Sequence, residues 1–218
     1  MGELRFREAT PSDFGDVLRL LPLLRTGDPL PDEATWQERL RPGSVVLEED
    51  GRVVAVAWAR TIGAWAHVVH VIVDEALQGR GLGRRLMEGL AACLRAAGCS
   101  RWYLNVKRDN EPALRLYRAL GFGTPVETEA LEVPVTAIGT LPAPEGALAA
   151  RIAAGEEDES IEATWELPHG IVADARARGE LPIALGARSE AFAIFHPPFG
   201  GAWLFRVAAP AWARPLLE

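Results

Sequence analysis

The sequence predicts an α/β fold in which helices cover a mixed β-sheet, and three observations support this class. Stretches of apolar residues at helical spacing alternate with short β-branched runs along residues 11–136. A strand pattern at residues 67–73 changes to a helical pattern at Gly83, through a glycine-rich turn. The 218 residues are 49% hydrophobic and 24% charged, a balance that excludes intrinsic disorder. The order of the elements excludes a helical bundle and a β-sandwich.

Local signals set the bounds of the first elements. Thr10-Pro-Ser-Asp is a helix-start signal, and Pro42-Gly43 ends a second helical stretch. Asp50-Gly51 between two β-branched runs is typical of a tight β-hairpin turn. We therefore expect helices at residues 11–24 and 32–40 and strands at residues 45–47, 53–59 and 67–73.

Glycines mark the ends of the next two helices. Gly98 and Gly121 each follow a helical stretch, a common place for a helix to end. Pro112 stands where a helix begins, and there its missing N–H costs no hydrogen bond. We expect helices at residues 84–97 and 112–120, a strand at 102–106, and a last strand at 129–136 that completes the sheet.

The remaining residues begin with a linker at 141–146 that contains Pro and Gly, so we expect one domain at 1–138 and an α/β extension at 139–218. Its pattern is again helical and then β, like that of residues 11–73. The extension is either a truncated, degenerate half-repeat without the glycine-rich turn or an unrelated α/β segment. The expected elements are helices at 147–154 and 161–178 and strands at 182–185, 191–195 and 202–208.

Charge and apolar patterning exclude several classes of protein. Acidic residues outnumber basic ones by 30 to 23, which argues against nucleic-acid binding. No apolar run approaches the ~20 residues of a membrane helix, and the N-terminus lacks the apolar core of a signal peptide. Cys93 and Cys99 have neither metal-ligand spacing nor a disulfide framework. We expect a cytoplasmic protein with reduced cysteines, no metal and no membrane contact.

The glycine-rich turn is the most informative segment. Gly79, Gly81 and Gly83 lie where a strand ends and a helix begins, and without Cβ atoms they permit positive φ and close approach of a ligand. The first N–H groups of the helix lack partners and carry the positive end of the helix dipole, so this terminus attracts an anion such as pyrophosphate. Side chains that can reinforce such a site are those of Gln78, Arg80 and Arg84.

Two other phosphate-binding motifs use the same physics, and neither fits. A Rossmann turn follows the first strand and has an acidic residue about twenty positions later, at the end of the next strand. Here the turn follows the third predicted strand, and Tyr103 stands twenty residues after Gly83. A P-loop needs Gly-Lys-Ser/Thr, which this turn lacks.

Two motifs of this chain match the sequence patterns of one known enzyme family. The turn is similar to the family pattern Gln/Arg-x-x-Gly-x-Gly/Ala at Gln78, Gly81 and Gly83. A later segment is similar to Asn-x-x-Ala-x-x-Leu/Phe-Tyr-x-x-x-Gly-Phe, with matches at Asn110, Ala113, Leu116, Tyr117, Gly121 and Phe122. Together the two motifs resemble the GNAT superfamily of acyl-CoA-dependent N-acetyltransferases. The resemblance covers about residues 3–136 and implies a mostly antiparallel sheet with helices on both faces.

The resemblance also implies roles for individual residues. Val73, at the end of the splayed fourth strand of such a fold, pairs with the pantetheine arm of acetyl-CoA, and Val71 or Ile72 offers an N–H to the thioester oxygen. Tyr117 matches the usual general acid, which protonates the departing thiolate, and Asn110 contacts the cofactor. The residues that cradle the pyrophosphate are Gln78, Gly79, Arg80, Gly81, Leu82, Gly83 and Arg84.

The general base of the family commonly lies on the strand that leads into the turn. His67 and His70 are the candidates, because an imidazole accepts a proton near neutral pH. They are three residues apart, so we expect them on opposite faces of the strand, with at most one near the substrate. One departure is the sequence Asp74-Glu75-Ala76, which adds two carboxylates where the family often has Pro.

The activity that the resemblance implies is transfer of an acetyl group from acetyl-CoA to a primary amine by direct attack, without a metal. The acceptor is a small molecule or a peptide, and the net charge of −7 favours cationic amines. The alternative is a noncatalytic acyl-CoA-binding or regulatory module. The extension either continues the sheet, walls off the acceptor side or provides a homodimer surface.

Overall fold

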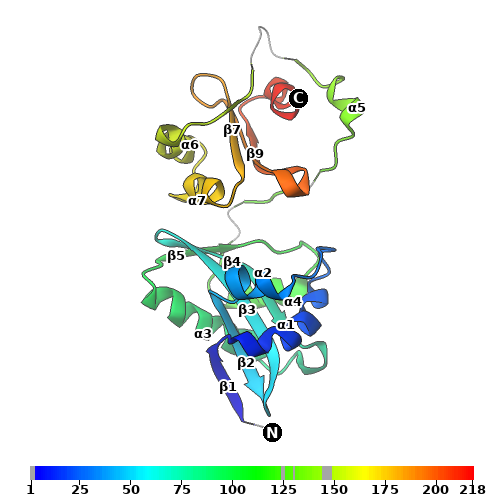
Figure 1. The fold of residues 1–218 in the computed structure, drawn as a ribbon, viewed down its shortest axis with the longest axis vertical. Coiled ribbons are helices and arrows are strands. Elements are labelled where there is room, and N and C mark those ends of the chain that lie inside the picture. Colours follow the sequence, from blue (N-terminus) through cyan, green and yellow to red (C-terminus); the bar gives the residue numbers. More distant parts are fainter. Residues whose placement is uncertain (1–2, 124–125, 130, 144–148) are drawn as a thin grey trace. The chain divides into compact units, whose positions relative to one another are not determined.

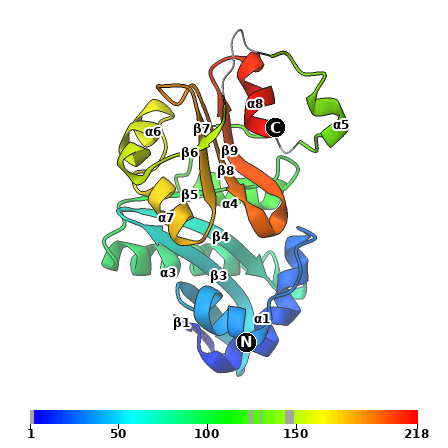
Figure 2. The same ribbon diagram turned by 45° about the horizontal axis from the view of Figure 1, so that its top comes forward.

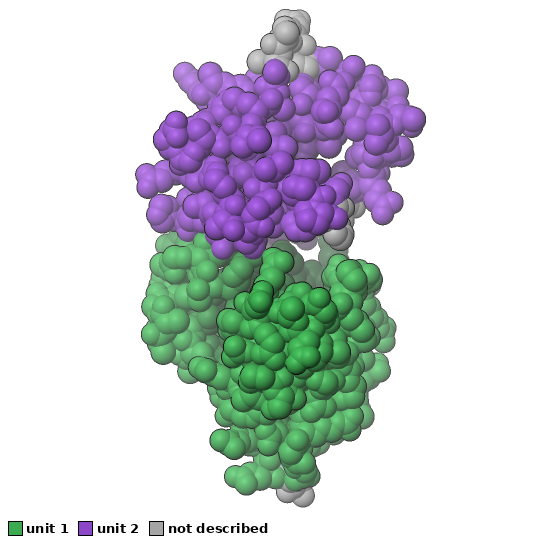
Figure 3. Space-filling view, viewed as in Figure 1, with its two compact units in different colours: residues 1–125 green, residues 126–218 purple. Residues whose placement is uncertain are grey.

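A computed structural model describes residues 3–123, 126–129, 131–143 and 149–218. The chain divides into two compact units, residues 1–125 and 126–218 (Figure 3). Each unit has its own β-sheet. The division falls before the boundary expected at residue 138, because in the described residues no strand after residue 104 joins the first sheet.

The sheet of the first unit has five strands in the order β1-β2-β3-β4-β5 (Figure 1). All neighbours are antiparallel except β4 and β5, which are parallel. Strand β1 was not predicted, although Leu4 and Phe6 alternate with arginines and pack toward the core. The strands are β1(Leu4–Glu8), β2(Ser44–Glu49), β3(Arg52–Ile62), β4(Trp65–Val73) and β5(Arg101–Leu104).

Helices cover both faces of this sheet, which confirms the predicted fold class (Figure 1). Leu86 and Leu90 of α3 and the partly buried Leu116 of α4 pack on one face. Val17 and Leu20 of α1 pack on the other, with Trp36 from a π-helical turn that follows α2. The helices are α1(Phe14–Leu20), α2(Glu33–Thr35), α3(Leu82–Ala96) and α4(Glu111–Ala119).

The helix expected at residues 11–24 is shorter than predicted. Only Phe14–Leu20 is α-helical, and a 3-10 turn lies at each end. Each turn has a proline at its first or second position, Pro11 in one and Pro22 in the other. Proline lacks the N–H that an uninterrupted α-helix needs, so Pro22 explains the change of helix type at the C-terminal end.

The second unit contains a four-stranded antiparallel sheet in the order β6-β7-β8-β9. Helices α6 and α7 lie on one side of it and α8 on the other (Figure 2). Leu216 of α8 packs on Leu185, Ala191 and Ala193. The elements are α5(Val135–Ile138), β6(Arg151–Ile152), α6(Asp158–Thr164), α7(Ile171–Ala177), β7(Leu181–Leu185), β8(Ala191–His196), β9(Gly201–Val207) and α8(Ala213–Leu217).

Three predictions for this part of the chain were wrong. The strand expected at 129–136 is not formed, and α5 begins at Val135, directly after Pro134; Ala130 lies outside the described residues. The helix expected at 147–154 contains β6 instead, while residues 147 and 148 lie outside the described part. The helix expected at 161–178 is broken at Pro168 and Gly170, where Gly170 takes φ of +87°.

The first strands of the two units are followed by the same arrangement of side chains. Arg7 of β1 donates to Asp13 at 2.7 Å, and Asp13 also accepts from the Thr10 N–H at 2.6 Å. Arg151 of β6 donates to Glu157 at 2.6 Å, and Glu157 accepts from the Ala154 N–H at 2.9 Å. In both units an arginine in the strand therefore holds an acid six residues later, and that acid caps a 3-10 turn.

Cys93 and Cys99 are both free thiols, as predicted. Burial raises the pKa of each. Within the described part of the chain, no helix is both long enough and apolar enough to cross a membrane.

Candidate functional site

An open strand edge lies at the centre of the first unit. Strand β4 pairs with β5 only from Trp65 to Val68, and its last residues run beyond the end of β5. On its other side β4 pairs with β3, where the Asp74 N–H donates to the Val54 carbonyl at 2.9 Å. The described residues supply no strand to the free side after Val68.

The β3 pairing decides which backbone groups face this open edge. Since Asp74 bonds to β3, alternation along the antiparallel ladder directs the N–H and C=O of Ile72 toward β3 as well. Those of Val71 and Val73 point the other way, and Gln78 Nε2 reaches the Val73 carbonyl at 3.4 Å. Of the two predicted oxyanion donors, the geometry therefore favours Val71 over Ile72.

A β-bulge in β4 overturns the expectation that His67 and His70 lie on opposite faces. Trp58 of β3 is opposite His70, and the next residue, Ala59, is opposite Val68. Val69 is thus an extra residue, and it shifts the alternation of side chains by one position. Both histidines consequently lie on the face of the sheet opposite to α3 and α4.

The surroundings of the two histidines differ. His67 lies in the paired half of β4, with its ring stacked on Tyr103 at 4.5 Å between centroids. His70 lies beside the open edge, and its ring centroid is 5.3 Å from that of Trp58. Neither ring nitrogen of His70 forms a hydrogen bond within the described residues. Burial lowers the pKa of His70, against an opposing effect of the Asp28 charge, so the imidazole is neutral at pH 7.

The glycine-rich turn after β4 presents an uncapped helix terminus. Gly79 and Gly81 have φ of +78° and +77°, and a Cβ at either would meet nothing within 4 Å. Gly81 is the N-cap of α3, and no side chain accepts from the first N–H groups of this 15-residue helix. Leu82 is buried in the core and anchors that helix end. The helix start and the positive φ values at the turn are as the sequence predicted, and an uncapped helix terminus of this kind is a common place for an anion to bind.

Gly83 has a different role from the other two glycines. A Cβ there would lie 3.1 Å from Leu116 Cδ2 of α4 and 3.8 Å from Val73 Cγ2. The absence of a side chain at Gly83 therefore lets α3 and α4 pack closely. The same contact places Leu116, and with it the next residue Tyr117, near the end of β4.

The two arginines of the turn have acidic partners. Arg80 forms a bidentate ion pair with Glu49 at 2.7 and 3.1 Å, and this hydrogen bond lowers the pKa of Glu49. Arg84 makes a longer, exposed contact with Glu88 at 3.4 Å. Arg84 is therefore the more available of the two for a phosphate. Glu49 was missed by sequence reasoning because it belongs to a distant strand.

The carboxylate of Asp74, which departs from the family pattern, is neutralised within the unit. Arg19 of α1 donates to it at 2.6 Å, and it accepts from the Ala76 N–H at 3.2 Å. The Arg19 hydrogen bond lowers the pKa of Asp74. Glu75 is exposed and lies 3.5 Å from Arg25.

Helix α4 positions Tyr117 on the α3 side of the sheet. Asn110 caps the helix, since its Oδ1 accepts from the Ala113 N–H at 3.2 Å. The Tyr117 ring is half-buried beside Phe122, at 5.8 Å between centroids. Burial raises the pKa of Tyr117, so the phenol stays protonated at neutral pH and can donate a proton. Tyr117 and His70 thus belong to opposite faces of the sheet.

The Asn110 cap gives a prediction for stability. We expect Asn110→Ala to lower the free energy of unfolding by about 1 kcal/mol, because an N–H of α4 loses its acceptor. Asn110→Asp keeps the acceptor and serves as the control, with a free energy close to that of the unchanged protein. Urea unfolding followed by circular dichroism measures both, and equal loss in the two variants contradicts a capping role.

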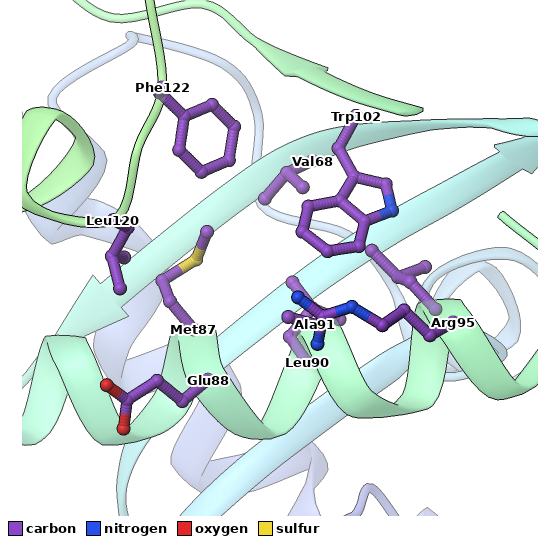
Figure 4. Close-up of a pocket in the computed structure, with 10 residues that line it drawn as sticks. Val68, Met87, Glu88, Leu90, Ala91, Arg95, Trp102, Leu120 and Phe122 are labelled. Carbon is purple, nitrogen blue, oxygen red and sulfur yellow. The ribbon is translucent and has the colours of Figure 1, made fainter. Parts of the chain in front are cut away.

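An apolar pocket lies on the α3 side of the first sheet (Figure 4). Arg95 lies over the Trp102 ring at 4.9 Å from its centroid. None of the predicted site residues lines this pocket. Its wall consists of Val68, Met87, Glu88, Leu90, Ala91, Leu94, Arg95, Trp102, Leu120 and Phe122.

The described residues contain no cluster of three His, Cys, Asp or Glu side chains that could hold a metal ion.

Comparisons with known proteins show which family this part of the chain resembles. Residues 16–122 match the model of the acetyltransferase (GNAT) family. The N-alpha-acetyltransferase RimI of Mycobacterium tuberculosis is 39% identical over 101 residues, which are 44% of this chain and 62% of that protein. The chloroplastic serotonin N-acetyltransferase 2 of Oryza sativa subsp. japonica is 37% identical over 124 residues, or 53% of this chain and 59% of that protein.

A solved structure supports the same family at the level of the fold. The crystal structure of a Trypanosoma brucei acetyltransferase matches with a TM-score of 0.50 and 26% identity, over 60% of this chain and all of that one. The chain spans less than two thirds of the length of the two curated relatives.

Proposed function

Residues 16–122 of this chain belong to the GNAT acetyltransferase family, and from this premise we propose that the protein transfers an acetyl group from acetyl-CoA to a primary amine. The observation that carries the proposal is the open edge of β4 directly before an uncapped helix terminus. The extended pantetheine arm of acetyl-CoA can pair with Val71 and Val73 as an added strand would, while its pyrophosphate binds at Gly79–Leu82.

The proposed reaction uses groups on both sides of this edge. Neutral His70 takes a proton from the ammonium group, and the amine then attacks the thioester carbonyl carbon. The Val71 N–H donates to the carbonyl oxygen as negative charge develops on it. The new C–N bond forms, the C–S bond breaks, and Tyr117 gives its proton to the departing thiolate. After the attack the nitrogen carries one excess proton, and this proton passes to the Tyr117 phenolate, so the products are the neutral amide, the CoA thiol and one proton held by His70.

The acceptor that we propose is a primary amine that carries a positive charge before the reaction. The relatives named above are acetyltransferases for N-terminal amines and for serotonin, according to their names. A primary amine is the feature that these acceptors share. The net charge of −7 draws a cationic amine toward the protein, and the Asp28 charge acts at His70 in the same direction.

Isothermal titration with CoA tests the cofactor site, and Gly81→Ala localises it. A methyl group at Gly81 enters the space beside the turn and weakens the amide hydrogen bonds to phosphate, so we expect about tenfold weaker binding or more. The control is Gly98→Ala at the other end of α3. Gly98 has φ of +84° and equally open surroundings, so both variants carry similar backbone strain.

The outcomes of this titration are distinct. Weaker CoA binding in Gly81→Ala but not in Gly98→Ala supports the turn as the phosphate site. No binding of CoA to the unchanged protein at millimolar concentration contradicts the proposal as a whole. Binding without CoA release on any amine, in a free-thiol assay with polyamines, aminoglycosides, amino acids and peptides, supports the noncatalytic alternative.

We also propose that the second unit is a truncated, degenerate repeat of the first half of the first unit. The order β6, α6, α7, β7, β8, β9, α8 follows that of β1, α1, α2, β2, β3, β4, α3. The pairs Arg7–Asp13 and Arg151–Glu157 support it, because they occupy the same place after the first strand. No glycine stands between β9 and α8, so we expect one molecule of CoA per chain in the same titration.

A further inference from the structure

Trp58 is the side chain that accompanies His70 at the open edge, and the proposed reaction gives it no role. It stands directly opposite His70 in the β3–β4 register, with 5.3 Å between the ring centroids and an interplanar angle of 53°. Both rings are half-buried. This pair exists because of the bulge at Val69, which aligns His70 with the side chain of Trp58.

The orientation of the indole is held from two sides. Trp58 Nε1 donates to the Pro42 carbonyl at 3.3 Å, and the β3 backbone on which it stands is bonded to both β2 and β4. Gly43 takes φ of +86°, and a Cβ there would lie 2.3 Å from the Ala59 carbonyl oxygen. The turn before β2 can therefore approach Trp58 only because it contains glycine at this position.

We propose that Trp58 is a specificity-determining residue, whose indole seats an apolar or aromatic group attached close to the acceptor amine while it shields His70 from water. The inference rests on the proposed function, since it takes His70 as the base. An amine within about 3 Å of an imidazole nitrogen of His70 lies next to the indole. Its carbon framework then passes the indole face, where apolar contact and the attraction between ammonium and π-system both act.

The charges near His70 are consistent with this assignment. Asp28, from the segment before α2, is the acidic group that acts on His70, and it favours a cationic acceptor before proton transfer. His67 and Arg60 lie on the same face, farther along β4 and β3 toward the paired half. The Trp58 indole helps to bury the His70 imidazole, and burial favours the neutral form of this base. We therefore expect removal of the indole to raise the pKa of His70 toward 6.5.

The test compares Trp58→Leu and Trp58→Phe with Trp65→Leu, a matched loss of indole on the same face but in the paired half of β4. The probes are 2-phenylethylamine and ethylamine, which differ by the ring. We expect the unchanged protein to prefer 2-phenylethylamine in kcat/KM. We expect Trp58→Leu to reduce that preference about tenfold, Trp58→Phe to retain most of it, and Trp65→Leu to leave it unchanged.

A second measurement needs no turnover. NMR titration of His70 is expected to show a pKa below 6.5 that rises in Trp58→Leu and much less in Trp58→Phe, and Trp65→Leu is expected to leave it in place. Equal use of the two amines by the unchanged protein, or an unaltered His70 pKa and preference in a folded Trp58→Leu, overturns the inference. If the unchanged protein does not bind CoA or acetylates no amine, the proposed function is contradicted instead. The NMR result needs no turnover, so it distinguishes failure of the Trp58 inference from failure of the proposed function.

Discussion

We expect Tyr117→Phe to lower kcat about 10²- to 10⁴-fold and to leave the dissociation constant for CoA nearly unchanged. The phenylalanine ring keeps the packing against Phe122, while the proton for the departing thiolate is lost. Burial raises the pKa of Tyr117, so this proton is present across the neutral range. Steady-state kinetics with an amine chosen by the free-thiol assay, together with titration calorimetry, measures the two effects.

The chain offers a matched control, because it contains only two tyrosines. Tyr103 lies in β5 and stacks on His67 in the paired half of β4. We expect Tyr103→Phe to change kcat by less than about twofold, since Phe retains the stacked ring and the proposed mechanism uses no proton from Tyr103. Equal losses of kcat and CoA affinity in Tyr117→Phe assign Tyr117 to packing.

We expect His70→Gln to reduce kcat by about 10²- to 10⁴-fold and to remove the acid limb of the pH profile. In the unchanged protein the base acts when neutral, so kcat/KM falls as pH drops through the His70 pKa. Burial lowers this pKa below the ordinary value of 6.5, so the limb lies on the acid side of pH 6.5. Measurement of kcat/KM at a series of pH values between pH 5 and pH 8 shows the acid limb directly.

His67→Gln is the control for this assignment. His67 is on the same face of β4 but belongs to the half that pairs with β5. We expect it to keep both the acid limb and most of kcat. An acid limb that disappears in His67→Gln and persists in His70→Gln reverses the roles of the two histidines.

Local signals in the sequence were enough to predict the turn and the motif helix. Gly79 and Gly81 have the positive φ that glycine permits, and the helix begins immediately afterwards. Helix α4 lies where the sequence predicted a helix at residues 112–120, with Asn110 as its N-cap and Tyr117 at an inner position. These features depend on residues within one or two helical turns, and such contacts leave a pattern in the sequence.

Features that depend on strand register could not be predicted in the same way. Alternation along a regular strand separates His67 from His70, but the bulge at Val69 brings them to one face. The choice of Val71 over Ile72 depends on the Asp74–Val54 hydrogen bond, which joins two strands. Glu49 reaches Arg80 from the end of β2, 31 residues away in the chain. Gly83 is a packing residue because Leu116 of α4 lies against it.

The sequence by itself predicted the fold class, the position of the glycine-rich turn and the resemblance to the family, because all three follow from local periodicity and short motifs. Only the tertiary structure decided which side of β4 is open, which histidine lies beside that edge and which tryptophan accompanies it. Side-chain direction along a strand reverses with each one-residue shift in register. A single extra residue, Val69, therefore rearranges the proposed site without leaving a recognisable signal in the sequence.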